Sequence, residues 1–269
     1  MSYVLKAIPA LFKQSVAGML QYRGEIILWA VWGIVYPAVA IAMWSSAAKN
    51  SITGLDIRGY GPDEFAAYFL LTMIVGHFCT AWDVYEMGYQ IKSGNMSAKL
   101  MRPLLPVWGA LTDNTAFKIL TMVVLAPIWV MVAWLTQPKF DTTWSHLTLG
   151  LLAMVLASTL NFIWGYTLAT VAFWNTRVDA LGEVWFGLSL FVGGRLAPLE
   201  ILPWPLQWAA KVLPFKWVIW FPSTALIGKL DTAEMVKGIL IQLIWLVVGI
   251  VLFRYAWRAG VKRYAAFGV

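Results

Sequence analysis

The chain has 269 residues, of which 61% are hydrophobic and only 12% are charged, and its mean hydropathy is +0.72. A soluble domain could not cover that much apolar surface, so the composition excludes a soluble protein and indicates an integral membrane protein. The net charge of +7 would suggest nucleic acid as the partner of a soluble protein. Here we attribute it to basic residues that face anionic membrane lipid, and we expect no nucleic-acid partner.

Residues 1–24 are predicted to form an amphipathic helix. Apolar residues such as Val4, Ile8 and Leu11 fall on one half of a helical wheel, whereas Lys6 and Lys13 fall on the other half. A basic helix of this kind lies flat in the cytoplasmic interface of a membrane. The pattern leaves two interpretations open: an elbow helix that frames a transporter, or a plain membrane-surface anchor.

The rest of the chain predicts an all-α polytopic fold in one transmembrane domain, residues 1–269. A hydrocarbon core about 30 Å thick needs roughly 20 helical residues to span it. Prolines exclude a single long helix after residue 197, so we expect residues 198–236 to form an outer region with re-entrant helices. The six predicted spans are residues 26–45, 64–82, 116–135, 146–174, 183–197 and 237–256.

The basic residues predict how these spans are oriented. When the amino terminus is placed in the cytoplasm, 12 of the 20 Lys and Arg residues fall on the cytoplasmic side: those of the termini and of residues 83–113, together with Lys118 and Arg177. The short loops on the opposite side hold only Lys49, Arg58 and Lys139. We therefore expect both termini to be cytoplasmic.

The predicted cytoplasmic loop, residues 83–113, contains a compact helical segment. Ser93-Gly94-Asn95 has the chemistry of a turn and a helix cap. Residues 96–101 then have room for one or two helical turns before Pro103 ends them. Met96 and Leu100 are four residues apart and share one helical face, which predicts an apolar knob that fits a groove on a partner.

This segment carries a resemblance to a known family. The pattern Ile-x-x-Gly followed by Leu-x-Arg-Pro-Leu, after two spans and an amphipathic first helix, resembles the type 2 membrane domain of bacterial ABC transporters. The residues that match are Ile91, Gly94, Leu100, Arg102, Pro103 and Leu104. The alternative is an ordinary basic loop held by anionic lipid.

The resemblance implies a permease subunit in the bacterial inner membrane that has no catalytic site and binds no cofactor of its own. The sequence agrees, because it lacks a G-x-x-x-x-G-K-[ST] motif. The resemblance implies further that two ATPase chains, which bind ATP and Mg²⁺, dock on two permeases, either identical or homologous, and drive transport outward. The residues expected to couple this chain to the ATPase are Ile91, Gly94, Asn95, Met96, Leu100, Arg102 and Pro103.

Four polar residues at predicted membrane depth are candidates for the pathway or its gate. His77 and Asn161 lie inside the second and fourth predicted spans, where they could line a polar path or simply hydrogen bond between helices. Arg195 and Glu200 flank the break after the fifth predicted span and could pair there. Such a pair would act either as an outer gate or as a stabilised bend.

Two other classes of function compete with the permease. An integral membrane enzyme with a metal is disfavoured by the presence of only two histidines, and we expect no metal site. A secondary transporter would need an inverted repeat and ion-coupling residues within the membrane, and neither is evident. A wide apolar pathway with few fixed charges would suit a lipid, a hydrophobic drug or an amphipathic compound.

Overall fold

The structure is a computed structural model that describes residues 2–50, 57–175 and 178–264. Within these ranges every regular element is a helix. Five segments of this described part are long and apolar enough to cross a membrane: Gly24–Lys49, Pro62–Lys92, Pro106–Thr136, Trp144–Phe173 and Thr232–Arg263. They confirm the expected all-α, multi-pass membrane protein.

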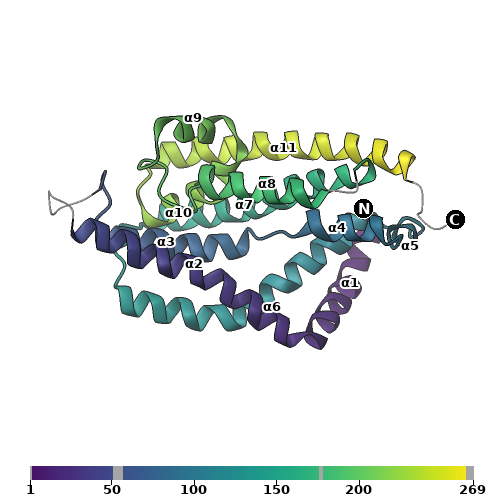
Figure 1. Ribbon diagram of the computed structural model, residues 1–269, viewed down its shortest axis with the longest axis horizontal. Coiled ribbons are helices and arrows are strands. Elements are labelled where there is room, and N and C mark those ends of the chain that lie inside the picture. Colours follow the sequence, from purple (N-terminus) through teal and green to yellow (C-terminus); the bar gives the residue numbers. More distant parts are fainter. Residues whose placement is uncertain (1, 51–56, 176–177, 265–269) are drawn as a thin grey trace.

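The long helices lie along the long axis of the molecule, as Figure 1 shows. They are α2 (Arg23–Lys49), α6 (Pro106–Thr136), α7 (Trp144–Ala169, continued by η1, Thr170–Phe173) and α11 (Thr232–Arg263). α11 begins where the Asp231 carboxylate accepts the Glu234 N–H at 2.7 Å. The start of α1 and the end of α11 lie at the same end of the bundle.

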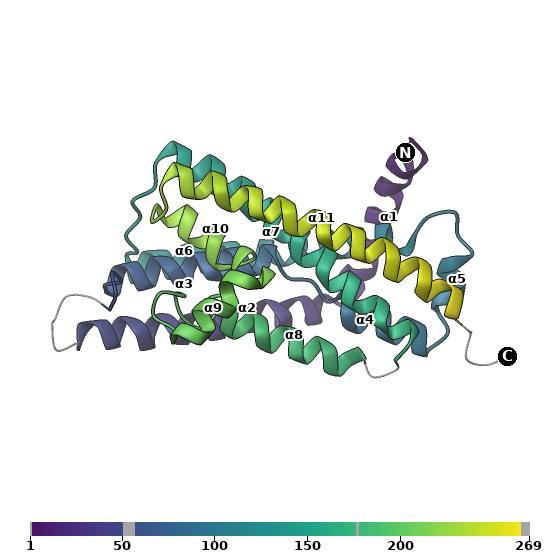
Figure 2. The same cartoon turned by 90° about the horizontal axis from the view of Figure 1, so that it is seen from above.

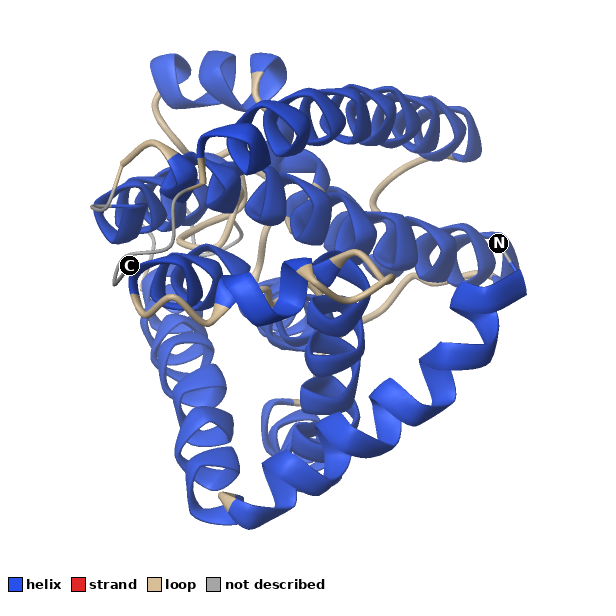
Figure 3. Cartoon of the chain, turned by 90° about the vertical axis from the view of Figure 1, so that its right-hand side faces the viewer, coloured by secondary structure: helices blue, strands red, loops and turns tan. Residues whose placement is uncertain are grey.

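The first helix, α1 (Ser2–Gln21), occupies the position expected of the amphipathic segment. It packs against α6 and runs obliquely to the long helices, across one side of the bundle when the molecule is viewed end-on (Figure 3). The Ser15 hydroxyl donates to the Asp113 carboxylate of α6 at 2.5 Å, which fixes the two helices to each other.

The second predicted span differs from its expected bounds. α3 (Pro62–Phe78) ends inside the bundle, and a second helix, α4 (Asp83–Lys92), continues in the same general direction. The range predicted as a cytoplasmic loop, 83–113, is therefore helical over Asp83–Lys92 and again from Pro106 onward. Residues 79–82 contain neither Gly nor Pro, so the sequence offered no reason to place a break there.

The fifth predicted span, 183–197, corresponds to a helix that is short for a bilayer. α8 (Val178–Val192) has 15 residues, or about 22 Å of helix, against a hydrocarbon core of about 30 Å. Because of this length, α8 is not among the five segments that qualify as spans. It runs antiparallel to α7 and returns the chain toward the opposite end of the bundle (Figure 2).

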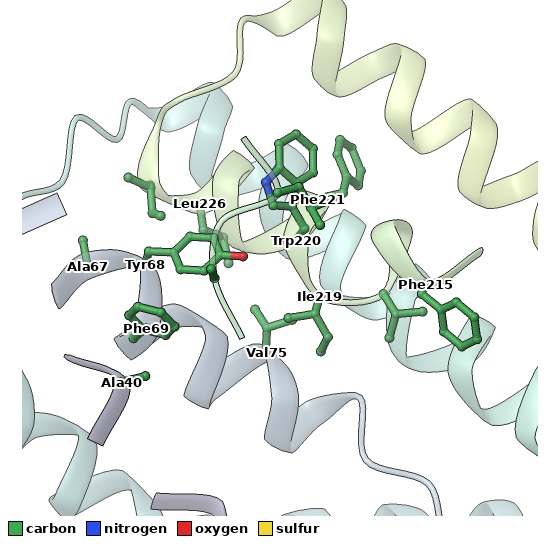
Figure 4. Packing of buried hydrophobic residues seen from close by; sticks show 14 of the residues in the cluster. Ala40, Ala67, Tyr68, Phe69, Val75, Phe215, Ile219, Trp220, Phe221 and Leu226 are labelled. Atoms are coloured by element: carbon green, nitrogen blue, oxygen red, sulfur yellow. The ribbon is translucent and has the colours of Figure 1, made fainter. Parts of the chain in front are cut away.

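Three short helices fill the range 198–236: α9 (Trp204–Val212), η2 (Pro214–Trp217) and α10 (Trp220–Ile227). α9 lies on the outside, whereas α10 is buried against α3 and α7. Figure 4 shows its residues Trp220, Phe221 and Leu226 in the main core with residues of α3. α11 approaches closely because residue 238 is glycine: a Cβ there would lie 2.1 Å from the Phe221 ring.

Candidate functional site

The candidate coupling segment forms a tight connection between α4 and α6. α4 ends at Lys92, and the chain turns through Gly94, whose φ of +76° is a conformation that glycine adopts without strain. One short helix, α5 (Met96–Leu100), follows, and α6 begins at Pro106 after the extended residue Leu105. The predicted turn and short helix are therefore present.

The burial of Met96 corrects the predicted docking face. Its side chain is 0% exposed and packs in a second core cluster with Met87 and Ile91 of α4 and with Trp257 of α11. Leu100 packs partly against the same cluster. The apolar face that we expected to fill a groove on a partner is filled by this chain's own helices.

The residues left available on this segment lie just after α5. Met101 is 82% exposed, and Arg102 and Pro103 beside it are exposed as well. Asn95 is exposed at the start of α5. We call Met101, Arg102 and Pro103 the exposed corner. Sequence analysis singled out Arg102 and Pro103 but missed Met101, because helical spacing alone does not tell an inward face from an outward one.

Contacts with the rest of the chain hold α5 in place. The hydroxyl groups of Ser97 and Tyr264 lie 3.0 Å apart, and the Tyr264 hydroxyl is 3.4 Å from the carbonyl oxygen of Gly94. The Tyr264 ring also packs edge-on against Phe173 of η1. At the end of α4, Lys92 forms a salt bridge with Asp179 of α8. The exposed corner is thus attached to α4, α8 and the end of α11.

Asn161 and His77 lie at the break between α3 and α4. A helix that ends inside the membrane leaves carbonyl groups without partners, and each would be costly in hydrocarbon. The Asn161 amide donates to the Cys79 carbonyl at 2.6 Å, and Ser158 and Asn114 donate to the carbonyls of Phe78 and Thr80. These contacts favour the structural interpretation of Asn161, namely hydrogen bonding between helices.

His77 takes part in the same network on the α6 side. Its Nε2 lies 3.0 Å from the Lys118 carbonyl oxygen, and its ring packs edge-on against Trp129. The Lys118 ammonium group, which sequence analysis had placed among the cytoplasmic charges, instead donates to the Ser158 hydroxyl at 2.9 Å. His77 and Asn161 therefore both belong to the contacts that stabilise the break.

The charges around the break complement the two helix ends. Lys118 and Arg195 both act electrostatically on Cys79, directly after α3, where the carbonyl ends of the helix carry partial negative charge. Asp83 and Glu86 occupy the first turn of α4, where the helix carries partial positive charge. The broken span thus has basic side chains near its carbonyl end and acidic side chains at its amide end.

Arg195 and Glu200 do not form the predicted pair. Within the described part of the chain the only salt bridge joins Lys92 and Asp179. The Arg195 Nε is buried without a hydrogen-bond partner, whereas the Glu200 carboxylate accepts the Trp220 indole N–H at 3.2 Å. Arg195 turns toward Gly76 of α3 instead, where a Cβ would lie 3.5 Å from its Nη1.

Glu200 belongs to a fixed bend at the far end of the bundle from α5. Its backbone carbonyl accepts a hydrogen bond from Arg58, and its carboxylate interacts with the Tyr60 hydroxyl. Burial, and secondly the Glu200 charge, raises the pKa of Tyr60, which therefore stays protonated. The neighbouring turn is fixed by the Tyr68 hydroxyl, which donates to the Gly194 carbonyl at 2.5 Å. These contacts fit a stabilised bend.

A cavity of about 880 Å³ opens beside the coupling segment. It is bounded by α1, the start of α2, the start of α4 and the first turns of α6, and Lys99 and Arg102 form part of its wall. A smaller cavity of about 300 Å³ adjoins it and shares Trp82, Glu86 and Asp113 with it. Among the residues described, no three His, Cys, Asp or Glu side chains are grouped closely enough to hold a metal ion.

A known protein family matches most of the chain. No curated protein and no solved structure matches it. The family described as ABC-2 family transporter protein matches residues 34–268, a range that includes the coupling segment, the break and every helix after α2. The chain therefore belongs to the ABC-2 transporter family and is a permease of that type.

Proposed function

We propose that this chain is the membrane subunit of an ATP-driven exporter, energised by two separate ATPase chains that bind ATP and Mg²⁺. The family match favours a transport component over the alternatives of a membrane enzyme or a secondary transporter. The observation that carries the proposal is the exposed corner at Met101–Pro103, since it projects at one end of the bundle from a segment attached to three helices.

The end of the bundle that holds α5 is the cytoplasmic end in this proposal. Lys92, Lys99 and Arg102 lie on or beside α5, and Arg258 and Arg263 lie near the end of α11 at the same end of the molecule. Such an excess of basic residues favours the cytoplasmic side of a bacterial inner membrane. α8 together with the turn after it then makes a sixth, thin crossing, and both termini are cytoplasmic.

A second permease, either a copy of this chain or a homologue, completes the transport path in our proposal. One bundle would present only one coupling segment to a pair of ATPases. The support is the large apolar side chains that remain exposed on α8, for example Phe186 and Phe191, in addition to those on the long helices. A helix too short to span the bilayer alone is a poor partner for lipid but packs well against protein.

Movement imposed on the exposed corner would reach the membrane through α4. The side chains of α4 pack in the second core cluster against one part of α7 and α11, whereas side chains of α3 pack in the main core against other parts of the same two helices. The break at residues 79–82 lies between α3 and α4 and is bridged by side-chain hydrogen bonds rather than helix backbone. In this proposal it is the point at which α4 shifts relative to α3.

Purification of the complex tests the proposal. The tagged full-length chain, isolated in mild detergent from its native membrane, should retain two ATPase chains and a second permease, as counted by native mass spectrometry. The complex should hydrolyse ATP only while the ATPase is bound. A chain that transports its substrate in vesicles with no ATPase present would contradict the proposed function.

A further inference from the structure

The cavity beside α5 has a wall with an excess of negative charge. Four carboxylates from four different helices line it: Glu25, Glu86, Asp113 and Glu183. Among the side chains that the structure describes, only two basic ones, Lys99 and Arg102, belong to the same wall. The chain as a whole has the opposite balance, with 20 Lys and Arg residues against 13 Asp and Glu residues. The described wall of the cavity therefore has more acidic than basic side chains, although the whole chain has more basic than acidic ones.

The hydrogen bonds recorded for these carboxylates come from neutral groups. Glu86 accepts from the Gln90 amide, Asp113 from the Ser15 hydroxyl and Glu183 from the Tyr85 hydroxyl. None of the four, among the described residues, forms a salt bridge within 4.0 Å. Neutral donors orient a carboxylate but leave its charge in place, so the cavity retains a field that attracts cations.

A fifth carboxylate, Asp83, points to a missing partner. Asp83 is only 7% exposed, its Oδ2 has no hydrogen-bond partner, and it lines the smaller cavity that adjoins the larger one. The charged groups that act on it are Lys118, Asp113 and Glu86, none of them within salt-bridge distance. A buried carboxylate oxygen without a donor is costly, and an occupant that supplies a donor or a positive charge would offset that cost.

The size and the aromatic groups of the cavity favour an organic cation over a metal ion. The carboxylates are too dispersed to coordinate a metal. Trp82, Tyr85 and Phe117 line the larger cavity, and the rings of Trp82 and Tyr85 lie 6.2 Å apart. Aromatic faces attract organic cations, and a volume of about 880 Å³ lies within the range of drug-sized ligand sites.

We infer that these joined cavities form an entry site for an amphipathic organic cation. The inference rests on the proposed function and narrows its substrate class. The apolar part of the ligand lies against Trp82 and Phe117, and its charge faces Asp83, Glu86 and Asp113. Lys99 and Arg102 belong to both the cavity wall and the coupling segment, so an occupant adjoins the part of the chain that faces the ATPase.

A pair of ions of equal shape and opposite charge tests this inference directly. Tetraphenylphosphonium and tetraphenylborate are measured separately against the detergent-solubilised full-length chain by equilibrium dialysis, with protein-free micelles as the blank. We expect saturable binding of tetraphenylphosphonium and no saturable binding of tetraphenylborate. Equal binding of both ions, or tighter binding of the borate as at a site for anionic lipid, overturns the inference.

Charge-neutral variants locate the bound cation. Asp83→Asn and the double variant Glu86→Gln/Asp113→Asn keep the shapes of the side chains and one acceptor oxygen in each, and remove the negative charge. Each should weaken tetraphenylphosphonium binding by about fivefold or more. Asp141→Asn, which removes an exposed carboxylate from the opposite end of the bundle, should bind as the wild type does. Wild-type binding by both cavity variants overturns the inference.

The isolated chain separates this inference from the proposed function. Binding by the permease alone, with loss of binding in the cavity variants, supports the cation site whether or not an ATPase is bound. If the complete complex then shows no change in ATP hydrolysis when tetraphenylphosphonium is added, the cation site stands and the coupling proposed above fails.

Discussion

The hydroxyl groups of Ser97 and Tyr264 lie 3.0 Å apart, and they join the short helix α5 to the residue that ends α11. These residues are separated by 167 positions in the sequence. The contact fixes the candidate coupling segment to the last long helix, so a force on α5 is shared between α4 and α11.

Removing this contact should loosen α5. We expect faster amide hydrogen exchange over residues 94–101 in Tyr264→Phe and in Ser97→Ala. The free energy of local opening should fall by about 0.5–1.5 kcal/mol, because one hydrogen bond contributes about that much. The double variant should exchange no faster than Tyr264→Phe, which loses the contact with the Gly94 carbonyl as well as the one with Ser97. Tyr255→Phe, at an exposed position of α11, serves as the control. Additive effects in the double variant would mean that the hydroxyls do not act as a pair.

Met96 and Met101 should differ sharply in their contribution to stability. Met96→Ala removes a fully buried side chain from the second core cluster and should lower the free energy of unfolding by about 2–5 kcal/mol. Met101→Ala changes an exposed side chain and should cost no more than about 0.5 kcal/mol. Thermal unfolding of the detergent-solubilised chain, followed by tryptophan fluorescence, measures both. Similar shifts for the two variants would contradict the burial of Met96.

The break between α3 and α4 should depend on Asn161. Asn161→Ala leaves the Cys79 carbonyl without its donor, a loss of about 1–3 kcal/mol. Thr159→Ala is the matched control, since Thr159 is exposed on the same helix and bonds only to the Val155 carbonyl. The same unfolding measurement compares them. An Asn161→Ala variant as stable as Thr159→Ala would show that the broken span does not need this contact.

The sequence predicted the positions of the long helices well because each of them is a run of consecutive apolar residues. The predicted spans 116–135 and 237–256 lie within α6 and α11, and the predicted span 146–174 matches α7 with its 3-10 extension except for its last residue, since η1 ends at Phe173. Residues 26–45 lie within α2 in the same way. The break after Phe78 could not be predicted, since it is stabilised by Asn114, Ser158 and Asn161, which lie far along the chain.

The candidate site was predicted less well for a similar reason. Spacing placed Met96 and Leu100 on one face of a short helix, and that is correct, but it could not say whether the face meets a partner or this chain's own α4 and α11. Lys118 was counted among the cytoplasmic charges, whereas its contacts are with Ser158 and the end of α3, which lie on other helices. The cavity is likewise assembled from helices distant in sequence.

Cysteine accessibility tests the proposed orientation. In a Cys79→Ala background, Ala98→Cys at the α5 end should react with a membrane-impermeant maleimide only after the membrane is opened, because that end faces the cytoplasm. Lys139→Cys, at an exposed position of the opposite end, should react in intact cells. Reaction of Ala98→Cys in intact cells would reverse the orientation.

Coupling through the exposed corner is the central claim, and ATPase binding measures it most directly. Met101→Asp/Arg102→Glu replaces an apolar and a basic side chain of the exposed corner with two acidic ones and leaves the buried face of α5 unchanged. We predict that the variant inserts and folds normally but co-purifies with less than about a tenth of the wild-type amount of ATPase, since interface centres tolerate unpartnered charge poorly. Lys139→Glu, exposed at the opposite end, should retain the full amount. A Met101→Asp/Arg102→Glu complex with wild-type ATPase content and wild-type ATP hydrolysis would contradict the account.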